Sequence, residues 1–178
     1  MDINDLEVLV KRIEFDDYYI EATFQFKLLM KLAEIFEEDK IFPERNIEKY
    51  MLKGLTKKEI DIVIEEKENM AIELKMPMNG QTPAEMYEFV GDIRFLEELK
   101  NCKIFSTCFF IAVTNDKKYW TGRELKDIYS FFRNNKVLQG HIKKPTGNNK
   151  HPYFDLTGKY NLEWKHLNNN FKYLILEI

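Results

Sequence analysis

Two acidic side chains and a lysine interrupt apolar runs between residues 59 and 77 of this 178-residue chain. Asp61 lies within "EIDIVIE", while Glu73 and Lys75 end the run "NMAIELK". Two ionised carboxylates brought together repel each other, and burying both is costly unless a cation lies between them. Such a pair suits Mg²⁺ or Mn²⁺, and a neighbouring lysine can assist a water molecule that attacks a phosphate. The residue types predict a site for metal-dependent phosphoryl chemistry.

The two runs are predicted to be the strands of a β-hairpin, joined by the polar segment "EKEN". Side chains alternate across a strand, so Ile60, Ile62 and Ile64 are expected on one face and Asp61 on the other. An exposed sheet face whose charges only keep the protein soluble is the ordinary alternative for the charged face.

The pairing register decides whether the acids meet. An antiparallel register in which paired residue numbers add to 134 would place Asp61 opposite Glu73, with Lys75 further along the same face. The tripeptide Glu-x-Lys occurs six times in the chain. The copy that begins at Glu73 follows a strand-like run and a strand with an internal aspartate, so its context distinguishes it.

Asp61, followed by Glu73-Leu74-Lys75 at the end of the next strand, resembles the signature of the PD-(D/E)XK nuclease superfamily, which has a restriction-endonuclease-like fold. The resemblance in element order covers roughly residues 16–115. It implies a metal-dependent nuclease in which Asp61 and Glu73 bind Mg²⁺ or Mn²⁺, the Leu74 carbonyl completes the ligand set, and Lys75 assists the attacking water. No proline precedes Asp61, which departs from the family pattern.

The resemblance implies three further candidate site residues. Members of the superfamily often add a glutamate from the first core helix, and Glu21 matches that position best. Glu44, on the first strand, is a second candidate metal ligand, and Gln81 is a candidate substrate-binding residue. Each also has an ordinary explanation: an acid in the first turn of a helix is favoured by the helix dipole, and polar residues are common before helix caps.

The preceding sequence predicts the first supporting elements. Apolar residues recur every four positions from Ile20 to Phe36, which predicts an amphipathic helix over residues 16–40 after a shorter helix near 4–12. The run 41–51 is expected to be a strand with Pro43 at an edge or strand end.

The following sequence predicts the remaining elements. Thr82 and Glu85 form a capping-box pattern at the start of a helix that extends to about residue 100. An apolar strand covered on both faces is expected over 104–115. Thr121 and Glu124 repeat the capping-box spacing and predict a helix over 121–134, with strand-like segments from there to the end. The fold class predicted is α/β (α+β): a restriction-endonuclease-like mixed β-sheet flanked by helices, in one domain over residues 1–178 with a strand-rich C-terminal extension.

Composition limits the class of protein. With 44% hydrophobic residues, the chain can bury a core, and no apolar run is long enough to span a bilayer. A soluble cytoplasmic protein without a membrane partner is expected, and Cys102 and Cys108 are expected to be reduced structural thiols. Residues 133–178 carry eight Lys/Arg against three Asp/Glu, so this basic extension could meet a polyanion.

The expected partner is nucleic acid, with DNA favoured over RNA, and the expected role is restriction, defence or repair. A homodimer is plausible because cutting two strands requires two sites; a partner subunit is also plausible. The alternatives are a non-catalytic nuclease-fold scaffold subunit of a larger complex and an RNA endonuclease. His141, His151 and His166 have no mutual ligand spacing, and Trp120 and Trp164 could stack on bases, although packing is the ordinary role.

Overall fold

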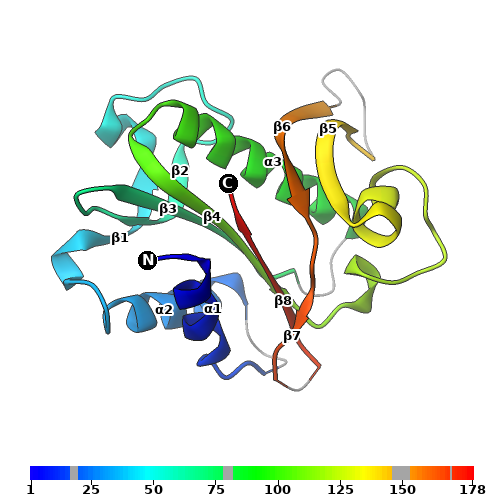
Figure 1. The fold of residues 1–178 in the computed structure, drawn as a ribbon, viewed down its shortest axis with the longest axis horizontal. Helices are drawn as coiled ribbons and strands as arrows, with labels where there is room; N and C mark the ends of the chain where they lie inside the picture. Colours follow the sequence, from blue (N-terminus) through cyan, green and yellow to red (C-terminus); the bar gives the residue numbers. More distant parts are fainter. Residues whose placement is uncertain (17–19, 78–81, 146–152, 169) are drawn as a thin grey trace.

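A mixed six-stranded sheet forms the centre of the computed structural model, which describes residues 1–16, 20–77, 82–145, 153–168 and 170–178 (Figure 1). The strand order is β1-β2-β3-β4-β8-β7, in which β3 and β4 are parallel and the other neighbours antiparallel. The strands are β1 (Ile41–Asn46), β2 (Glu59–Ile64), β3 (Asn69–Lys75), β4 (Phe105–Thr114), β7 (Lys165–His166) and β8 (Lys172–Glu177). A separate two-stranded sheet pairs β5 (Val137–Lys143) with β6 (Tyr153–Asn161). The mixed α/β class is therefore confirmed.

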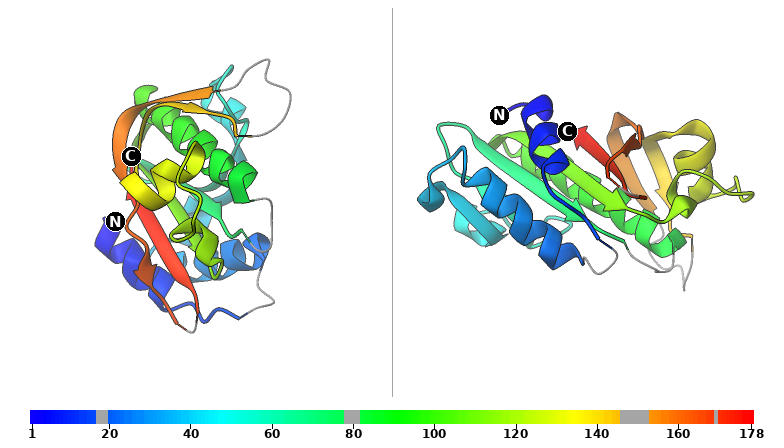
Figure 2. Two further views of the ribbon diagram at one scale, coloured as in Figure 1. Left: turned by 90° about the vertical axis from the view of Figure 1, so that its right-hand side faces the viewer. Right: turned by 90° about the horizontal axis from the view of Figure 1, so that it is seen from below.

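Helices cover both faces of the six-stranded sheet (Figures 1 and 2). α1 (Ile3–Lys11) and α2 (Glu21–Leu32) pack on one face, and α3 (Thr82–Asn101) packs on the other. Each face has its own apolar core: Ile62, Ile72 and Phe109 contribute to the α1/α2 core, whereas Ala71 and Phe110 contribute to the α3 core. Among the described residues, no helix combines the length and apolarity that crossing a membrane requires.

Most of the predicted elements are present. The shorter N-terminal helix is α1, the helix predicted over 82–100 is α3, and the run 104–115 forms β4, which is buried on both faces. β1 is an edge strand and contains Pro43, as expected, but it ends at Asn46, and a 3-10 turn at Ile47–Tyr50 replaces the rest of the run expected over 41–51. Of the basic extension, β8 pairs with β4, so the extension completes the main sheet. Both cysteines are free thiols, and burial raises the pKa of Cys108 to about 12.

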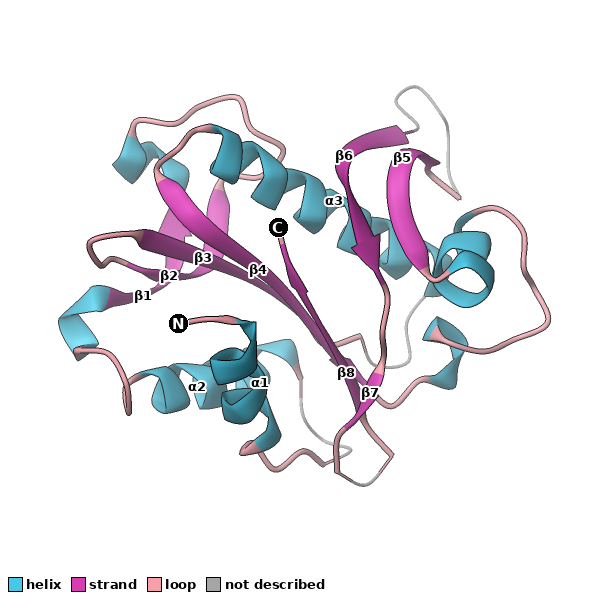
Figure 3. Ribbon diagram, viewed as in Figure 1, coloured by secondary structure: helices cyan, strands magenta, loops and turns pink. Residues whose placement is uncertain are grey.

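Two helix predictions were wrong in extent or kind (Figure 3). The helix expected over 16–40 is confined to α2 and ends at Leu32, before a turn. The helix expected over 121–134 is replaced by a loop and a π-helical turn at Ser130–Asn135. Arg133 fixes the shape of this loop, because its guanidinium donates to the carbonyls of Lys118 and Glu124.

Glu97 joins the two-stranded sheet to α3. The register of β5 and β6 shifts at Thr157 and Gly158, and the amides of these two residues donate to the Glu97 carboxylate at 2.9 and 2.7 Å instead. The Tyr160 hydroxyl donates to the same carboxylate at 2.9 Å, and Glu97 is 4% exposed. A bulge in β6 is therefore satisfied by one buried acid.

Glu97→Ala is expected to lower the free energy of unfolding by about 2–4 kcal/mol, because it leaves buried donors without an acceptor. Urea unfolding followed by circular dichroism measures this change. Glu88→Ala, at an exposed position on the same helix, is the matched control and is expected to change the value by less than about 0.5 kcal/mol. Equal effects of the two substitutions would show that Glu97 does not hold the β5–β6 sheet.

Glu7 provides a pH-dependent link between α1 and β7. Its carboxylate lies 2.6 Å from the ammonium groups of both Lys11 and Lys165. Hydrogen bonds from these two lysines lower the pKa of Glu7 from 4.5 to about 2. The folded state thus favours the ionised form, so this stabilisation is present above pH 4.5 and is lost as the pH falls through about 2.

Glu7→Gln is therefore expected to lower the free energy of unfolding at pH 7 by about 1 kcal/mol. The difference from the unsubstituted protein should shrink steadily between pH 4.5 and about 2, where glutamate becomes neutral as glutamine is. Urea unfolding across this range tests the linkage. A difference that stays constant throughout the range would contradict it.

Candidate active site at the β2–β3 hairpin

The hairpin has the register that brings the two predicted acids together. Ile62 pairs with Ile72 in β2 and β3, and this register, continued by one residue, sets Asp61 opposite Glu73. The Asp61 amide donates to Glu73 Oε1 at 3.4 Å, and the Leu74 amide donates to Asp61 Oδ2 at 2.7 Å. The strands therefore have the register, with paired residue numbers adding to 134, under which the two acids were expected to meet, and each carboxylate accepts a hydrogen bond from the other strand.

Strand alternation fails at one predicted position. Ile62 and Ile64 belong to the α1/α2 core as expected, but Ile60 belongs to the α3 core. The edge strand is irregular at the same level, because Glu44, between the residues that pair with Ile60 and Ile62, has a left-handed φ of 49°. The irregular backbone at this level accompanies the break in alternation on β2.

Glu73 lies against α3, where two further charged residues meet it. Its carboxylate is fully buried and forms an ion pair with Lys57, which comes from the loop before β2. The Lys57 ammonium also donates to Asp92 Oδ1 at 2.9 Å, and Asp92 projects from α3 with 4% exposure. A solvated sheet face does not describe this arrangement, since Glu73 is inaccessible to water.

Lys75 extends the cluster towards α2. Its ammonium lies 3.4 Å from Asp92 Oδ2 and 3.8 Å from Glu21 Oε1. Asp92 Oδ2 is buried and accepts no hydrogen bond from the described part of the chain, so the Lys75 ammonium is its charged neighbour. Glu21, the first residue of α2, also accepts a hydrogen bond from the Met76 amide at 3.0 Å. We call Glu21, Lys57, Asp61, Glu73, Lys75 and Asp92 together the β2–β3 site.

Burial dominates the titration of the two hairpin acids. It raises the pKa of Asp61 to about 6, and attraction by Lys57 offsets this only in part. Burial, followed by repulsion from Asp61 and Asp92, raises the pKa of Glu73 well above its usual range. Both carboxylates would therefore be stabilised in their ionised form by additional positive charge.

The two lysines behave in the opposite way. Burial alone would lower the pKa of Lys57, but the charges of Glu73 and Asp92 raise it overall. Burial also lowers the pKa of Lys75, but attraction by Asp92 and Glu21 raises it overall. Both side chains are consequently ammonium ions at neutral pH. The site contains four carboxylates and two ammonium groups, so its net charge is −2 when all six groups are ionised.

Glu44, also named from the sequence, lies outside the β2–β3 site. The Glu44 carboxylate accepts a hydrogen bond at 2.7 Å from Gln25 of α2, which also donates to the Asp61 carbonyl at 2.8 Å. Glu44 is thus turned towards α2, away from the Glu73 and Asp92 carboxylates on the α3 side. Gln81 lies outside the described residues.

Sequence reasoning missed Lys57 and Asp92. Asp92 carried a detectable signal, because it falls on the stripe of α3 that Phe89 and Leu96 place against the sheet, where a charged residue is unusual. Lys57 is one of two adjacent lysines in a loop, and nothing in its spacing distinguishes it from Lys58. The tertiary fold alone brings it to Glu73.

The β2–β3 site opens to solvent through a cavity of about 350 Å³. Lys57, Lys75 and Asp92 line it, together with Tyr87 and Phe154, whose rings are stacked with centroids 4.9 Å apart. The two lysines are therefore reached from one side, next to an aromatic wall and the exposed acid Glu88.

The donor set fits one divalent cation. Asp61 and Glu73 offer carboxylate oxygens, and the net charge of −2 on the ionised site would be neutralised by one Mg²⁺ or Mn²⁺ ion. Within the described residues, however, no three His, Cys, Asp or Glu side chains are already arranged around a common point. Lys57 accounts for this at Glu73, because its ammonium holds the oxygen that a metal would bind.

Comparisons with known protein families, with curated proteins and with solved structures found no significant match to this chain.

Proposed function

We propose that this protein is a metal-dependent nuclease that hydrolyses phosphodiester bonds in DNA at the β2–β3 site. The observation that carries the proposal is the hairpin register, which sets Asp61 against Glu73. Asp92, which shares the Lys57 ammonium with Glu73, lies 3.4 Å from the Lys75 ammonium. Bound Mg²⁺ or Mn²⁺ would supply positive charge to stabilise charge that develops on the phosphate. Asp61 and Glu73 are the residues that would hold it, with the Leu74 carbonyl and Glu21 as further ligands.

The residues of the chain have separable roles in this proposal. Lys75 is an ammonium ion, so it donates a proton or a hydrogen bond and stabilises the phosphate oxygens, and does not act as the base. Asp92 and Glu21 hold this ammonium group in place. The Leu74 amide fixes the Asp61 carboxylate at 2.7 Å.

A cleavage panel tests the proposed function. Single- and double-stranded DNA and RNA would be incubated with Mg²⁺ or Mn²⁺, with the unsubstituted protein beside Glu73→Gln, which keeps the volume of the buried side chain. We expect metal-dependent cleavage of DNA that Glu73→Gln abolishes. Cleavage of RNA alone would change the substrate, and cleavage that survives Glu73→Gln would overturn the assignment of the site.

One observation favours a second candidate, a nuclease-fold module that binds without turnover. Lys57 already neutralises Glu73 from within the chain, and Asp92 holds the same ammonium. An internal cation at this position stabilises the fold without any metal. The module would bind nucleic acid but leave every substrate of the panel intact.

A further inference from the structure

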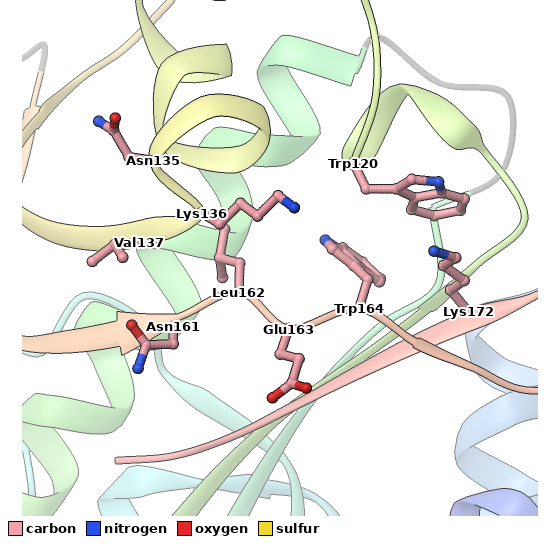
Figure 4. A pocket seen from close by; sticks show the side chains of 9 residues that line it. All are labelled: Trp120, Asn135, Lys136, Val137, Asn161, Leu162, Glu163, Trp164 and Lys172. Atoms are coloured by element: carbon pink, nitrogen blue, oxygen red, sulfur yellow. The ribbon is translucent and has the colours of Figure 1, made fainter.

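A second cavity, of about 410 Å³, contains none of the residues of the β2–β3 site (Figure 4). It contains both tryptophans of the chain, Trp120 and Trp164, whose rings are 5.5 Å apart and tilted by 50°. Val137 and Leu162 add apolar surface. Its volume falls within the range of about 300–1,000 Å³ that is usual for small-ligand sites.

The polar groups of this cavity favour an anion. Lys136 and Lys172 both line it, and the Lys172 ammonium lies 4.9 Å from the centre of the Trp120 ring. Figure 4 shows the Lys136 side chain extending towards the indole nitrogen of Trp164, while the one acid of the lining, Glu163, points away from both rings. A cationic ligand would meet two lysines here, so the cavity disfavours it.

One donor in the cavity lacks an acceptor. Trp164 Nε1 is buried and has no hydrogen-bond partner in the described part of the chain. A buried N–H without a partner is costly, and an acceptor on a bound ligand would satisfy it. The side-chain amides of Asn135 and Asn161, at the far end of the cavity from Trp120 in Figure 4, offer both donors and acceptors.

We infer that this cavity binds an unpaired nucleotide. The base packs against the indole rings, the phosphate lies between Lys136 and the Trp164 N–H, and the asparagine amides contact the polar edge of the base or the sugar. Stacking on aromatic rings combined with lysine–phosphate contacts is how proteins hold single-stranded nucleic acid. A duplex would not fit this description, because its bases are stacked on one another.

The cavity and the β2–β3 site lie on one face of the sheet. Lys75 pairs with Ala112 of β4, and Ala112 pairs with Leu174 of β8. Lys172 lies two residues from Leu174 and so shares its face, about 12 Å from Lys75 by strand spacing and rise. Tyr119 and the start of α3 stand between them, where the Tyr119 hydroxyl donates to Glu85 at 2.5 Å. The cavity and the β2–β3 site are therefore neighbours on one face of the sheet, not parts of one pocket.

Intrinsic fluorescence tests this inference directly, because the chain has two tryptophans and both line the cavity. The protein would be titrated in EDTA, which prevents metal-dependent cleavage, with decathymidylate, its duplex with decaadenylate, thymidine monophosphate, inorganic phosphate and an oligoglutamate peptide. We expect the single strand to quench the emission most strongly. Quenching by the monophosphate at equal nucleotide concentration would identify a free nucleotide as the ligand source.

Substitutions separate the contributions of the Trp164 N–H and the Lys136 ammonium to binding. Trp164→Phe keeps a ring but removes the N–H, and is expected to weaken binding about tenfold, with Trp120 as the remaining emitter. Lys136→Gln should make the negative slope of log affinity against log salt concentration less steep by about 0.7. Lys159→Gln, exposed on β6 outside the cavity, is the matched control and should change affinity less than about twofold.

Several outcomes would overturn the inference: no quenching by any nucleotide, equal quenching by phosphate or oligoglutamate, or equal quenching by the duplex. Binding is measured without metal, so it is independent of the proposed function. Quenching without cleavage in the metal panel would retain this inference and reject the nuclease, and the reverse result would do the opposite.

Discussion

Lys57→Met is expected to lower the free energy of unfolding by about 3–5 kcal/mol in EDTA at pH 8. Glu73 is 0% exposed and its ion pair with Lys57 supplies the positive charge that its burial requires. Without this ammonium, the carboxylate must either remain charged and buried or take up a proton. Its pKa is already raised well above the usual range, so the loss of stability should be smaller at low pH, where protonation is easier.

Two controls identify the cause. Lys58→Met changes the adjacent, exposed lysine and is expected to alter the free energy of unfolding by less than about 0.5 kcal/mol. The double substitution Lys57→Met with Glu73→Gln removes both charges of the pair and should recover much of the loss, because no buried charge is left unpaired. If the double variant is as unstable as Lys57→Met alone, the defect lies in packing.

The same variant distinguishes the two candidate functions. Removal of the Lys57 ammonium frees a Glu73 oxygen, so Mg²⁺ should stabilise Lys57→Met more than it stabilises the unsubstituted protein. A shift of the urea midpoint with Mg²⁺ concentration measures this difference. No shift in either protein would mean that the acids do not bind the ion, which favours the non-catalytic module.

The hairpin shows how far the sequence determines a site. The pairing register is a local property of two short strands, so "EIDIVIE" and "NMAIELK" allowed the meeting of Asp61 and Glu73 to be anticipated, although alternation breaks at Ile60. Lys57 and Asp92 were not predictable in this way, because a loop and a helix bring them to Glu73 only after α3 has packed on the sheet. Glu44 was named from its position on a strand, but the irregular backbone there turns it towards Gln25.

The same distinction explains the fold. β4 was predictable because a continuous apolar run of that length requires cover on both faces. α1, expected near 4–12, begins at Ile3, where Asp2 and Asp5 form a capping box. The helix expected over 121–134 rested on a similar capping pattern from Thr121 and Glu124. There, Glu124 accepts a hydrogen bond from the Lys126 amide, so a local turn replaces the helix start. Arg133, more distant in sequence, then fixes the loop by donating hydrogen bonds to the carbonyls of Lys118 and Glu124.

Lys75→Met is expected to lower the rate of DNA cleavage by about 10²–10⁴-fold, the range for a group that transfers or donates a proton or stabilises charge in the transition state. The fold should be retained, because the Lys75 side chain is 19% exposed and its partner Asp92 keeps the ammonium of Lys57 at 2.9 Å. Single-turnover cleavage with saturating Mg²⁺ measures the rate, urea unfolding checks stability, and Lys58→Met serves as the unaffected control. Asp61→Asn keeps the acceptor for the Leu74 amide but removes a carboxylate whose pKa is about 6. It should therefore raise the Mg²⁺ concentration required for cleavage while the fold is retained. If Lys75→Met cleaves at the control rate, Lys75 is a structural ion-pair partner, and the β2–β3 site requires another source of positive charge at the phosphate.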